Sequence, residues 1–593
     1  MTDVPSPGII ESPLIKVGGT ALTDANTKQL TDCRVELAIG RPGRAVLRFF
    51  DPEFSMIDSA TFTIGKVLDV SFTAGATIKP VFNGEIVTVG LETGPNDEPV
   101  FIVTAYDKGH RLSRKSVVKV YKDSKYSDIV SAIAGRNSLT AQATATTQVF
   151  EHLIQQSDDA SMLDEIAKAT GMVWWVEGTK LMMKEPTMAG ATVTLTMRVN
   201  LRRLRVNATA SAVTSTVKVI GWDAKSKAAI TGTSSSLPAQ LATSTLSTGA
   251  RGAPTQFGVN ERTTSRRSVL SVSEAETVAK SLHRRAGTDE IDLRGEADGN
   301  ADIKLGSTIT LAGVGTKLAG DYFVTAVEHQ YSGRAFRTRF TSAGTSQSTL
   351  VDLLGGGQTR WQSQGPVIGV VTEVGKETFA GSVKVKLPTL GVDMVSGWAR
   401  VVTVGGGKLR GFMVLPTIDD EVLVTFEDGD LRRPVVLGGL WNGKDKVPTQ
   451  PVFNGAGAVA EWVVQSPVGH TLTFRDGDGD DKQNVEIALK DKTIKLFVGT
   501  DKVELFAKDG KPLQIKSGDA SITLTAAGDV EIKGKNVKIT STADTSIAGA
   551  NIKAEAQAKV TLKGTAGFEA TGATVKIEGQ GPTEIKGAIV KIN

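Results

Sequence analysis

The sequence predicts a mainly β fold in three parts: barrel-like domains with a few helices, a small closed barrel, and a C-terminal intertwined triple-stranded β-helix formed by a homotrimer. Three observations support this fold class. The chain has 63 glycines among 593 residues, above the roughly 7% of average proteins, which indicates many tight turns. Runs of alternating apolar and polar residues recur from about residue 12 onward. A short apolar couplet repeats at nearly constant spacing through the C-terminal region.

The size and composition limit the possible classes of protein. A chain of 593 residues exceeds one hydrophobic core, so we expect roughly three to five domains of about 100–200 residues each. Hydrophobic residues make up 40% and charged residues 22%, as in an ordinary globular protein. The single cysteine, Cys33, excludes an internal disulfide framework and suits a reducing cytosol. The net charge of +4 is spread over interleaved acids and bases, which disfavours a nucleic-acid partner.

The sequence also carries information about targeting. The first residues, MTDVPSPGII, lack the basic and apolar regions of a secretion signal. No run of about 18 apolar residues occurs anywhere in the chain. We therefore expect cytoplasmic assembly without a membrane-spanning helix, and the sequence leaves later release from the cell open.

The N-terminal part, residues 1–352, is predicted to contain two barrels. Alternating runs such as VELAIG, AVLRFF and FIVTAYD predict a β barrel at about 12–110. An α+β insertion is expected at about 111–200, and further strands predict a second barrel at about 201–345. The stretch LLGGGQTRWQSQG at 353–365 is rich in Gly and Gln and is expected to be a linker.

Local signals predict individual elements within this part. Ser127 is the expected N-cap of one helix, and Gly171 is the expected C-terminal stop of the next. A hairpin is expected to turn at Glu177 and Gly178. The Ser- and Thr-rich residues 231–256 indicate a lid-like loop, and a helix is expected from about Ser273 to Ala286.

Residues 366–446 are predicted to form the small barrel. Five strand-like runs are separated by Gly, Pro and Asp turns, and they start PVIGVV, GSVKVK, GWARVV, EVLVTF and RPVVLG. Five strands of this length fit a Greek-key barrel of the OB type. An OB barrel that binds oligonucleotides needs exposed aromatic residues on a basic groove. The aromatic residues Trp398, Phe412, Phe426 and Trp441 are spread among apolar neighbours, so we expect them in the core and disfavour such binding.

The C-terminal repeat consists of two β-formers separated by one residue, typical of a short strand with one buried face. The couplets recur at steps that alternate between 8 and 7 residues, and turn residues separate many of them. Between residues 485 and 515 the same couplet recurs at steps of 9 to 10. The predicted core positions are Ile522, Leu524, Val530, Ile532, Val537, Ile539, Val560, Leu562, Val575, Ile577, Val590 and Ile592.

Two inward side chains per strand cannot fill the interior of a single-chain solenoid. Three chains around one axis would close a narrow prism in which each strand pairs with strands of the neighbouring chains and no edge stays free. The sequence therefore predicts a trimeric needle over residues 462–593. About sixteen strands at ~4.8 Å each give a needle of roughly 75 Å, longer than the ~40–45 Å of a bilayer.

The region around the small barrel resembles a known family. The run GFMVLPTIDDEVLVTFEDGDLRRPVVLGGLWNGKDKVP, with GWARV before it and GHTLTF after it, resembles the OB module and needle entrance of VgrG-type spikes. Residues ~10–350 resemble, more loosely, the hub domain of phage late control protein D and of VgrG. That likeness is carried by QQSDDASMLDEIAKATGMVWWVEGTKL, SEAETVAKSL and LAGDYFVTAVEHQYSGRAFRTRF.

The resemblance implies a structural spike and hub of a contractile injection system. Family membership implies that the two barrels of each chain form a pseudo-sixfold ring in the trimer, which adapts a sixfold inner tube to the threefold needle. It implies these partners: an inner tube protein, baseplate proteins, a PAAR-like tip cap protein, effector cargo and, transiently, the target cell membrane. The cap is expected on the tip formed by Ile589, Val590, Lys591, Ile592 and Asn593.

The sequence shows no catalytic, cofactor or metal motif. The five histidines are widely separated, and neither a GxSxG elbow nor a phosphate-binding GxxxxGK[ST] loop occurs. The run RDGDGDD at 475–481 has calcium-like Asp spacing but lacks the downstream glutamate of a full loop. A solvated hairpin tip is favoured there, with a bound cation as the alternative. We expect no enzyme.

Two other classes of protein compete with this interpretation. A trimeric receptor-binding tail fibre or adhesin would use the β-helix as a stalk, but it predicts a terminal globular head. A polysaccharide-cleaving β-helix enzyme needs a wider solenoid with a cluster of carboxylate or basic residues on one face. The sequence does not distinguish a phage tail, a type VI apparatus and an extracellular injection particle, and it identifies neither target cell nor cargo.

Overall fold

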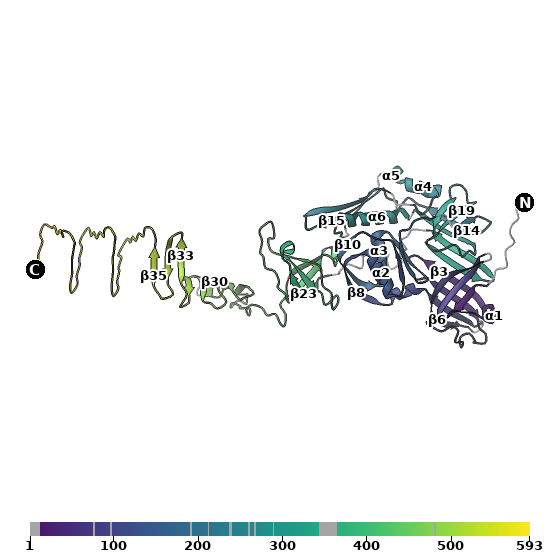
Figure 1. The fold of residues 1–593 in the computed structure, drawn as a ribbon, viewed down its shortest axis with the longest axis horizontal. Helices are drawn as coiled ribbons and strands as arrows, with labels where there is room; N and C mark the ends of the chain where they lie inside the picture. Colours follow the sequence, from purple (N-terminus) through teal and green to yellow (C-terminus); the bar gives the residue numbers. More distant parts are fainter. Residues whose placement is uncertain are drawn as a thin grey trace. The chain divides into compact units, whose positions relative to one another are not determined.

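The computed structural model describes most of the chain, as two compact units that divide after residue 446. The mainly β fold expected from the sequence is confirmed, with few helices among many strands (Figure 1). The described residues are 12–74, 77–94, 98–189, 193–211, 213–236, 240–258, 261–265, 268–288, 290–342, 365–479 and 482–592. The predicted linker at 353–365 therefore lies almost wholly outside the described residues.

One large sheet dominates the first unit. Its eleven strands follow the order β14-β18-β22-β21-β3-β4-β7-β6-β5-β1-β2. The strands are β1 (Leu14–Val17), β2 (Thr20–Ala21), β3 (Leu30–Ala38), β4 (Arg44–Phe50), β5 (Val67–Ala74), β6 (Thr77–Glu92), β7 (Val100–Tyr106), β14 (Leu201–Ala208), β18 (Ile291–Asp298), β21 (Ala326–Ser332) and β22 (Ala335–Ser342). The short helix α1 (Asp24–Lys28) precedes β3.

The two barrel regions expected at about 12–110 and 201–345 share this sheet. The connection is the antiparallel pair β21–β3, in which His329 lies opposite Val35. Local periodicity predicts strands but not which distant strands pair, so the sequence could not show this connection. Strand alternation builds the core on one face: in β7 every second residue is buried, and Phe49, Phe101 and Leu47 are at most 1% exposed.

A smaller α+β region follows β7. It contains η1 (Lys108–Ser113), β8 (Ser116–Lys125), α2 (Tyr126–Arg136), β9 (Thr140–Ala143), β10 (Val149–Asp158), α3 (Asp159–Thr170), β11 (Val173–Glu177) and β12 (Lys180–Lys184). Strands β8 and β10 pair with each other, and β11, β12 and β9 form a second sheet. The apolar faces of α2 and α3 pack into a core that includes Ile129, Leu163 and Trp174.

The local signals in this region have mixed outcomes. Gly171 ends α3 in the left-handed conformation, with a φ of 74°, and the hairpin turn after Glu177 is present, so both predictions are confirmed. The predicted N-cap at Ser127 is wrong, because α2 begins at Tyr126 and Ser127 lies inside its first turn. Lys125 holds the cap position, and its backbone N–H donates to Asp128 Oδ2 at 3.0 Å.

Two small sheets and three helices complete the N-terminal part. One sheet contains β13 (Val193–Thr196), β19 (Thr308–Ala312) and β20 (Gly320–Phe323), and the other contains β15 (Thr216–Asp223), β16 (Ala228–Ser234) and β17 (Glu261–Thr264). Helix α6 (Val272–Thr288) confirms the expected helix and packs on β15 and β16. The prediction of a lid-like loop at 231–256 is only partly correct. The helices α4 (Thr245–Gly252) and α5 (Pro254–Phe257) form within or at the end of this segment. The Ser244 hydroxyl caps α4 by accepting from Ser247 N at 3.2 Å.

The five-stranded barrel that the sequence predicts is present, and its strands close in the order β23-β24-β25-β27-β26. Its strands are β23 (Val367–Val374), β24 (Ser382–Lys386), β25 (Ala399–Val401), β26 (Glu421–Phe426) and β27 (Pro434–Gly439), with short turns η2 (Glu377–Phe379) and η3 (Glu427–Gly429). Valines from all five strands fill its interior, among them Val371, Val383 and Val424.

The prediction that four aromatic residues fill this barrel core is wrong for three of them. Phe426 is buried, but Phe412 is 54% exposed and Trp441 is 70% exposed. Trp398 is half-buried and stacks on Phe379 with ring centroids 4.7 Å apart. These three residues lie outside the barrel strands, where the alternation that places a side chain inward does not apply.

The second unit begins with antiparallel strands. A five-stranded sheet contains β28 (Glu461–Gln465), β29 (Thr471–Asp476), β30 (Gln483–Ala488), β31 (Ile494–Gly499) and β32 (Val503–Ala507), and a three-stranded sheet contains β33 (Leu513–Ser517), β34 (Ala520–Leu524) and β35 (Val530–Lys533). These strands pair within one chain, whereas the sequence predicted pairing between chains. The longer spacing of this segment leaves room for hairpin turns. Residues 534–592 carry no strand in the single chain (Figure 1).

Candidate functional site

The predicted core of the needle is exposed in the single chain. We use the name needle seam for the twelve residues Ile522, Leu524, Val530, Ile532, Val537, Ile539, Val560, Leu562, Val575, Ile577, Val590 and Ile592. Their exposed fractions range from 43% at Leu524 to 88% at Ile592. Exposed apolar surface costs about 25 cal/mol per Å² relative to burial. A regular series of such residues along the chain indicates a surface that would be stabilised if another chain covered it.

Charged residues alternate with the seam. Lys576 pairs with Glu578 and Lys586 pairs with Glu584, and all four side chains are between 66% and 82% exposed. Lys553 and Glu555 form a similar exposed pair at 2.5 Å. Because lysine and glutamate remain hydrated on the outside of an assembly, this alternation favours an apolar interior and a polar exterior for the wound chain.

The predicted tip has the same character. Ile589 is 80% exposed, Val590 is 48% exposed, and Lys591 is also exposed. Ile592 is the last described residue, and Asn593 lies outside the described residues.

The acidic run at 475–481 begins in β29 and ends before β30, and these two strands pair antiparallel. Asp478 accepts a hydrogen bond from the backbone N–H of Gly455. Asp480 and Asp481 lie outside the described residues. Within the described ranges, no group of three or more His, Cys, Asp or Glu side chains is placed to hold a metal ion.

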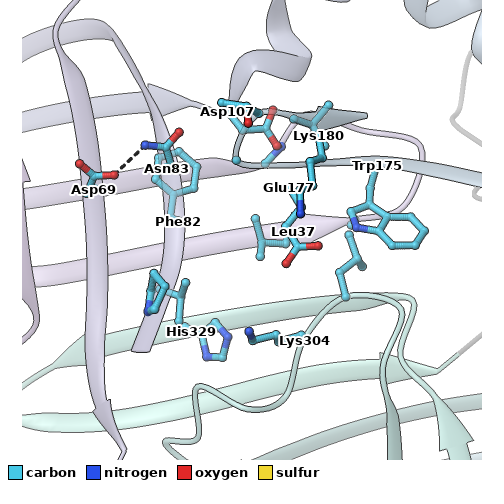
Figure 2. Close-up of a pocket in the computed structure, with 18 of the residues that line it drawn as sticks. Leu37, Asp69, Phe82, Asn83, Asp107, Trp175, Glu177, Lys180, Lys304 and His329 are labelled. Atoms are coloured by element: carbon cyan, nitrogen blue, oxygen red, sulfur yellow. Dashed lines mark hydrogen bonds between the residues drawn. The ribbon is translucent and has the colours of Figure 1, made fainter. Parts of the chain in front are cut away.

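A cavity of about 400 Å³ lies in the N-terminal part, and the sequence did not predict it. Figure 2 shows side chains from separate elements around it: Trp175, Glu177 and Lys180 come from the β11–β12 hairpin, Lys304 comes from the segment between β18 and β19, and His329 comes from β21. On the far side, Asn83 donates to Asp69 Oδ1 at 2.6 Å. No sequence motif marks this cavity because its lining residues come from segments far apart in the chain.

Two titratable groups that line this cavity have pKa values shifted by burial. Burial raises the pKa of Asp107 to about 7, although the backbone N–H groups of Gly43 and Gly109 donate to it at 2.7 and 2.8 Å. Burial lowers the pKa of His329 to about 4. Since Asp107 caps η1 with these hydrogen bonds, its carboxylate holds the backbone in place and is not free to serve as a general base.

A buried ion cluster joins the small barrel to the N-terminal part. Arg432 donates to Asp430 Oδ2 at 2.7 Å and to Glu274 Oε1 at 2.8 Å, and its guanidinium lies 5.4 Å from the ring centre of Phe150. Although burial alone would lower it, the two carboxylates hold the pKa of Arg432 above its ordinary value. Ile154 extends the contact by packing into the barrel core. The only sequence signal for this joint is the pair of adjacent arginines before Pro434.

No described helix has both the length and the apolar character needed to cross a membrane.

Two protein families match the chain. Residues 10–333 match the family described as the Alg8 N-terminal domain. Residues 367–441 match the family described as the type VI secretion system/phage-baseplate injector OB domain. The second match coincides with the closed barrel of β23 to β27.

Curated relatives are similar over shorter stretches. The type VI secretion system spike protein VgrG5 of Pseudomonas aeruginosa is 32% identical over 106 residues, which is 16% of this chain and 13% of that protein. The actin cross-linking toxin VgrG1 of Vibrio cholerae is 28% identical over 179 residues, which is 27% of this chain and 16% of the toxin. The chain thus matches less than a fifth of the length of either relative.

One solved structure matches over a larger share of the chain. A component of the type VI secretion system from E. coli, described as similar to the T4 bacteriophage tail proteins gp27 and gp5, has a TM-score of 0.45 and 13% identity. It covers 72% of this chain and 99% of its own.

The first family covers more than half of the sequence, and the second covers the barrel that follows it. This chain therefore belongs to the family of the Alg8 N-terminal domain, carries an injector OB domain, and is a homologue of the VgrG spike proteins of type VI secretion systems.

Proposed function

We propose that this protein is the trimeric hub and spike of a contractile injection system, and that its C-terminal region is a needle that pierces a target membrane. The needle seam is the observation that carries the proposal. Its residues are apolar, belong to the couplet repeat that advances in alternating steps of 8 and 7, and are at least 43% exposed in one chain. Three chains wound about one axis would bury them and leave the lysine and glutamate pairs outside.

The proposed architecture has four parts. Residues 1–352 form the hub, 353–365 the linker, 366–446 the OB barrel and 462–593 the needle. In the trimer, the hub would form a ring that meets a sixfold inner tube on one side and passes to threefold symmetry at the barrel. Homology to spike proteins supports this arrangement, and the hub–barrel joint at Arg432 would keep the two parts together under load.

The proposed role is mechanical. Force would come from contraction of the surrounding sheath, and the needle would transmit it because its backbone is tied across three chains. The proposed partners are the inner tube protein, baseplate proteins, effector cargo and a PAAR-like cap on the tip at 589–593. The particle would assemble in the cytoplasm before release or delivery. The name of one relative, the actin cross-linking toxin of Vibrio cholerae, includes an enzymatic activity. We propose no such activity for this chain.

The test begins with the mass of the full-length protein, measured by native mass spectrometry. A trimer of three times 62.5 kDa is expected, and a stable monomer would contradict the proposal. Negative-stain imaging of particles from the native host, with this chain labelled, should then place the label at the centre of the baseplate. Label at the distal end of a long fibre would support the receptor-binding alternative instead.

A further inference from the structure

The large hub sheet carries an arginine-rich concavity that the proposed function does not use. Its volume is about 840 Å³, and it lies over β14, β18, β22, β21, β3 and β4. We use the name arginine face for its six arginines, which are Arg41, Arg44, Arg203, Arg205, Arg294 and Arg339. Three glutamates, Glu36, Glu296 and Glu328, line the same concavity, so positive charge is in excess.

Strand register places most of these side chains in one row. Arg203 lies opposite Glu296, which lies opposite Arg339. Arg339 lies opposite Glu328, which lies opposite Glu36, and Glu36 lies opposite Arg44. Residues directly opposite on neighbouring strands point to the same face of a sheet. The row is therefore a property of the fold, because it combines residues from 36 to 339.

The glutamates of the row are already occupied. Glu296 accepts from Arg337 at 2.9 Å and from Arg339 at 3.0 Å. Glu328 accepts from Arg339 at 2.5 Å. Although partial burial opposes it, the hydrogen bonds from these guanidiniums hold the pKa of Glu296 below its ordinary value. The carboxylates of the concavity are thus already paired with arginines, and Glu36 lies 3.9 Å from Arg44.

At the β14 end the arginines are in surplus. Arg203 and Arg205 are exposed, and neither has an ion-pair partner among the described residues. Arg294, opposite Arg205, is 69% exposed, and its one ion-pair contact among the described residues is with Asp292, at 3.4 Å. Arg41 is exposed at the other side of the concavity and is likewise unpaired within the described ranges. Guanidiniums kept close together without carboxylates repel one another unless an anion lies between them.

We infer that the arginine face is a docking surface for a carboxylate-rich segment of a partner protein. Guanidinium groups bind carboxylates through two parallel hydrogen bonds, so Arg203, Arg205 and Arg294 suit clustered Asp or Glu side chains. A nucleic acid fits less well, because its continuous phosphates would pass close to Glu36, Glu296 and Glu328. The two aromatic residues that line the concavity offer bases little stacking surface, since Phe340 is only 2% exposed and Tyr106 is half-buried.

The probe for the test is a fluorescently labelled oligoglutamate peptide, with the full-length protein titrated against it by fluorescence anisotropy. The triple variant Arg203→Gln, Arg205→Gln, Arg294→Gln should weaken binding about tenfold or more at physiological salt. The matched control Lys225→Gln, Lys227→Gln, Lys408→Gln removes the same charge from exposed positions outside the concavity, and it should bind as the wild type does.

Three results would overturn the inference. One is equal weakening by both triple variants, which would reduce the effect to net charge. Another is tighter binding of a DNA oligonucleotide of equal charge, with the same three arginines responsible. The third is a change of oligomeric mass in the arginine variant alone, which would place this surface between copies of the chain. Circular dichroism of each variant verifies that the sheet is intact.

Discussion

The hub and the proposed needle differ in how far a single chain buries their apolar side chains. In the hub, side chains such as Phe49, Phe101 and Trp174 are at most 1% exposed within one chain. In the needle, Ile539 and Ile577 are more than 70% exposed in the same single chain. Both regions consist of short β-forming runs, so composition does not explain the difference. The hub has enough strands to cover its own faces, whereas the proposed needle presents only two apolar residues per repeat, which we propose other copies cover.

The largest effect is expected from charges placed in the needle seam. The double substitution Val560→Lys and Leu562→Lys should abolish trimer formation, since six lysines would meet on the threefold axis without counter-ions. Native mass spectrometry should then report the monomer, with the near-ultraviolet circular dichroism of the hub aromatic residues retained. As a control, Lys563→Gln alters an outward position and should leave the trimer intact. A trimer that still forms with the double substitution would contradict the proposal that the needle seam lies in the trimer interior.

The next effect concerns the joint between hub and barrel. Arg432→Met should lower the free energy of unfolding by about 3–5 kcal/mol, because Glu274 and Asp430 would remain as buried, unpaired charges. Chemical denaturation of the full-length protein and of the variant measures this loss of unfolding free energy. Arg400→Met removes an arginine that is 53% exposed and pairs with Glu427, and it should cost less than about 1 kcal/mol. Equal losses in the two variants would show that the buried cluster has no special role.

A smaller effect is the pH dependence of the hub. Asp107 has a pKa of about 7 in the folded chain and an ordinary value of 3.8, so the folded state binds the proton more tightly. Its contribution to stability is complete below pH 4 and is lost as the pH rises through 7. Asp107→Asn, which keeps a hydrogen-bond acceptor, should remove up to about 4 kcal/mol of this decline. Denaturation midpoints of the wild type and of the variant at pH 4, 6 and 8 measure this decline. The same dependence on pH in the two proteins would refute the prediction.

The smallest effect is expected on the outside of the needle. Lys576 and Glu578 form an exposed pair, and such pairs contribute about 0–1 kcal/mol. Lys576→Gln should therefore shift the thermal midpoint of the assembled protein only slightly, while Ile577→Gln next to it should shift it strongly. Comparable shifts at the two neighbouring positions would mean that the inward and outward assignments are not distinct.

The sequence by itself determined the mainly β class, the five strands of the OB barrel, the helices ending at Gly171 and spanning 273–286, and the couplet repeat. These features depend on residues close together in the chain, through alternation, caps and turns. The buried or exposed position of Phe412 and Trp441 was not determined, because loop residues have no periodic constraint.

Only the tertiary structure decided which distant strands meet. The pair β21–β3 merges two predicted barrels into one sheet, and the register of that sheet aligns Arg203, Glu296, Arg339, Glu328 and Glu36 in one row. The cluster at Arg432 likewise joins residues more than 150 positions apart. Such contacts depend on the global packing of the chain, so a local pattern of amino acids does not predict them.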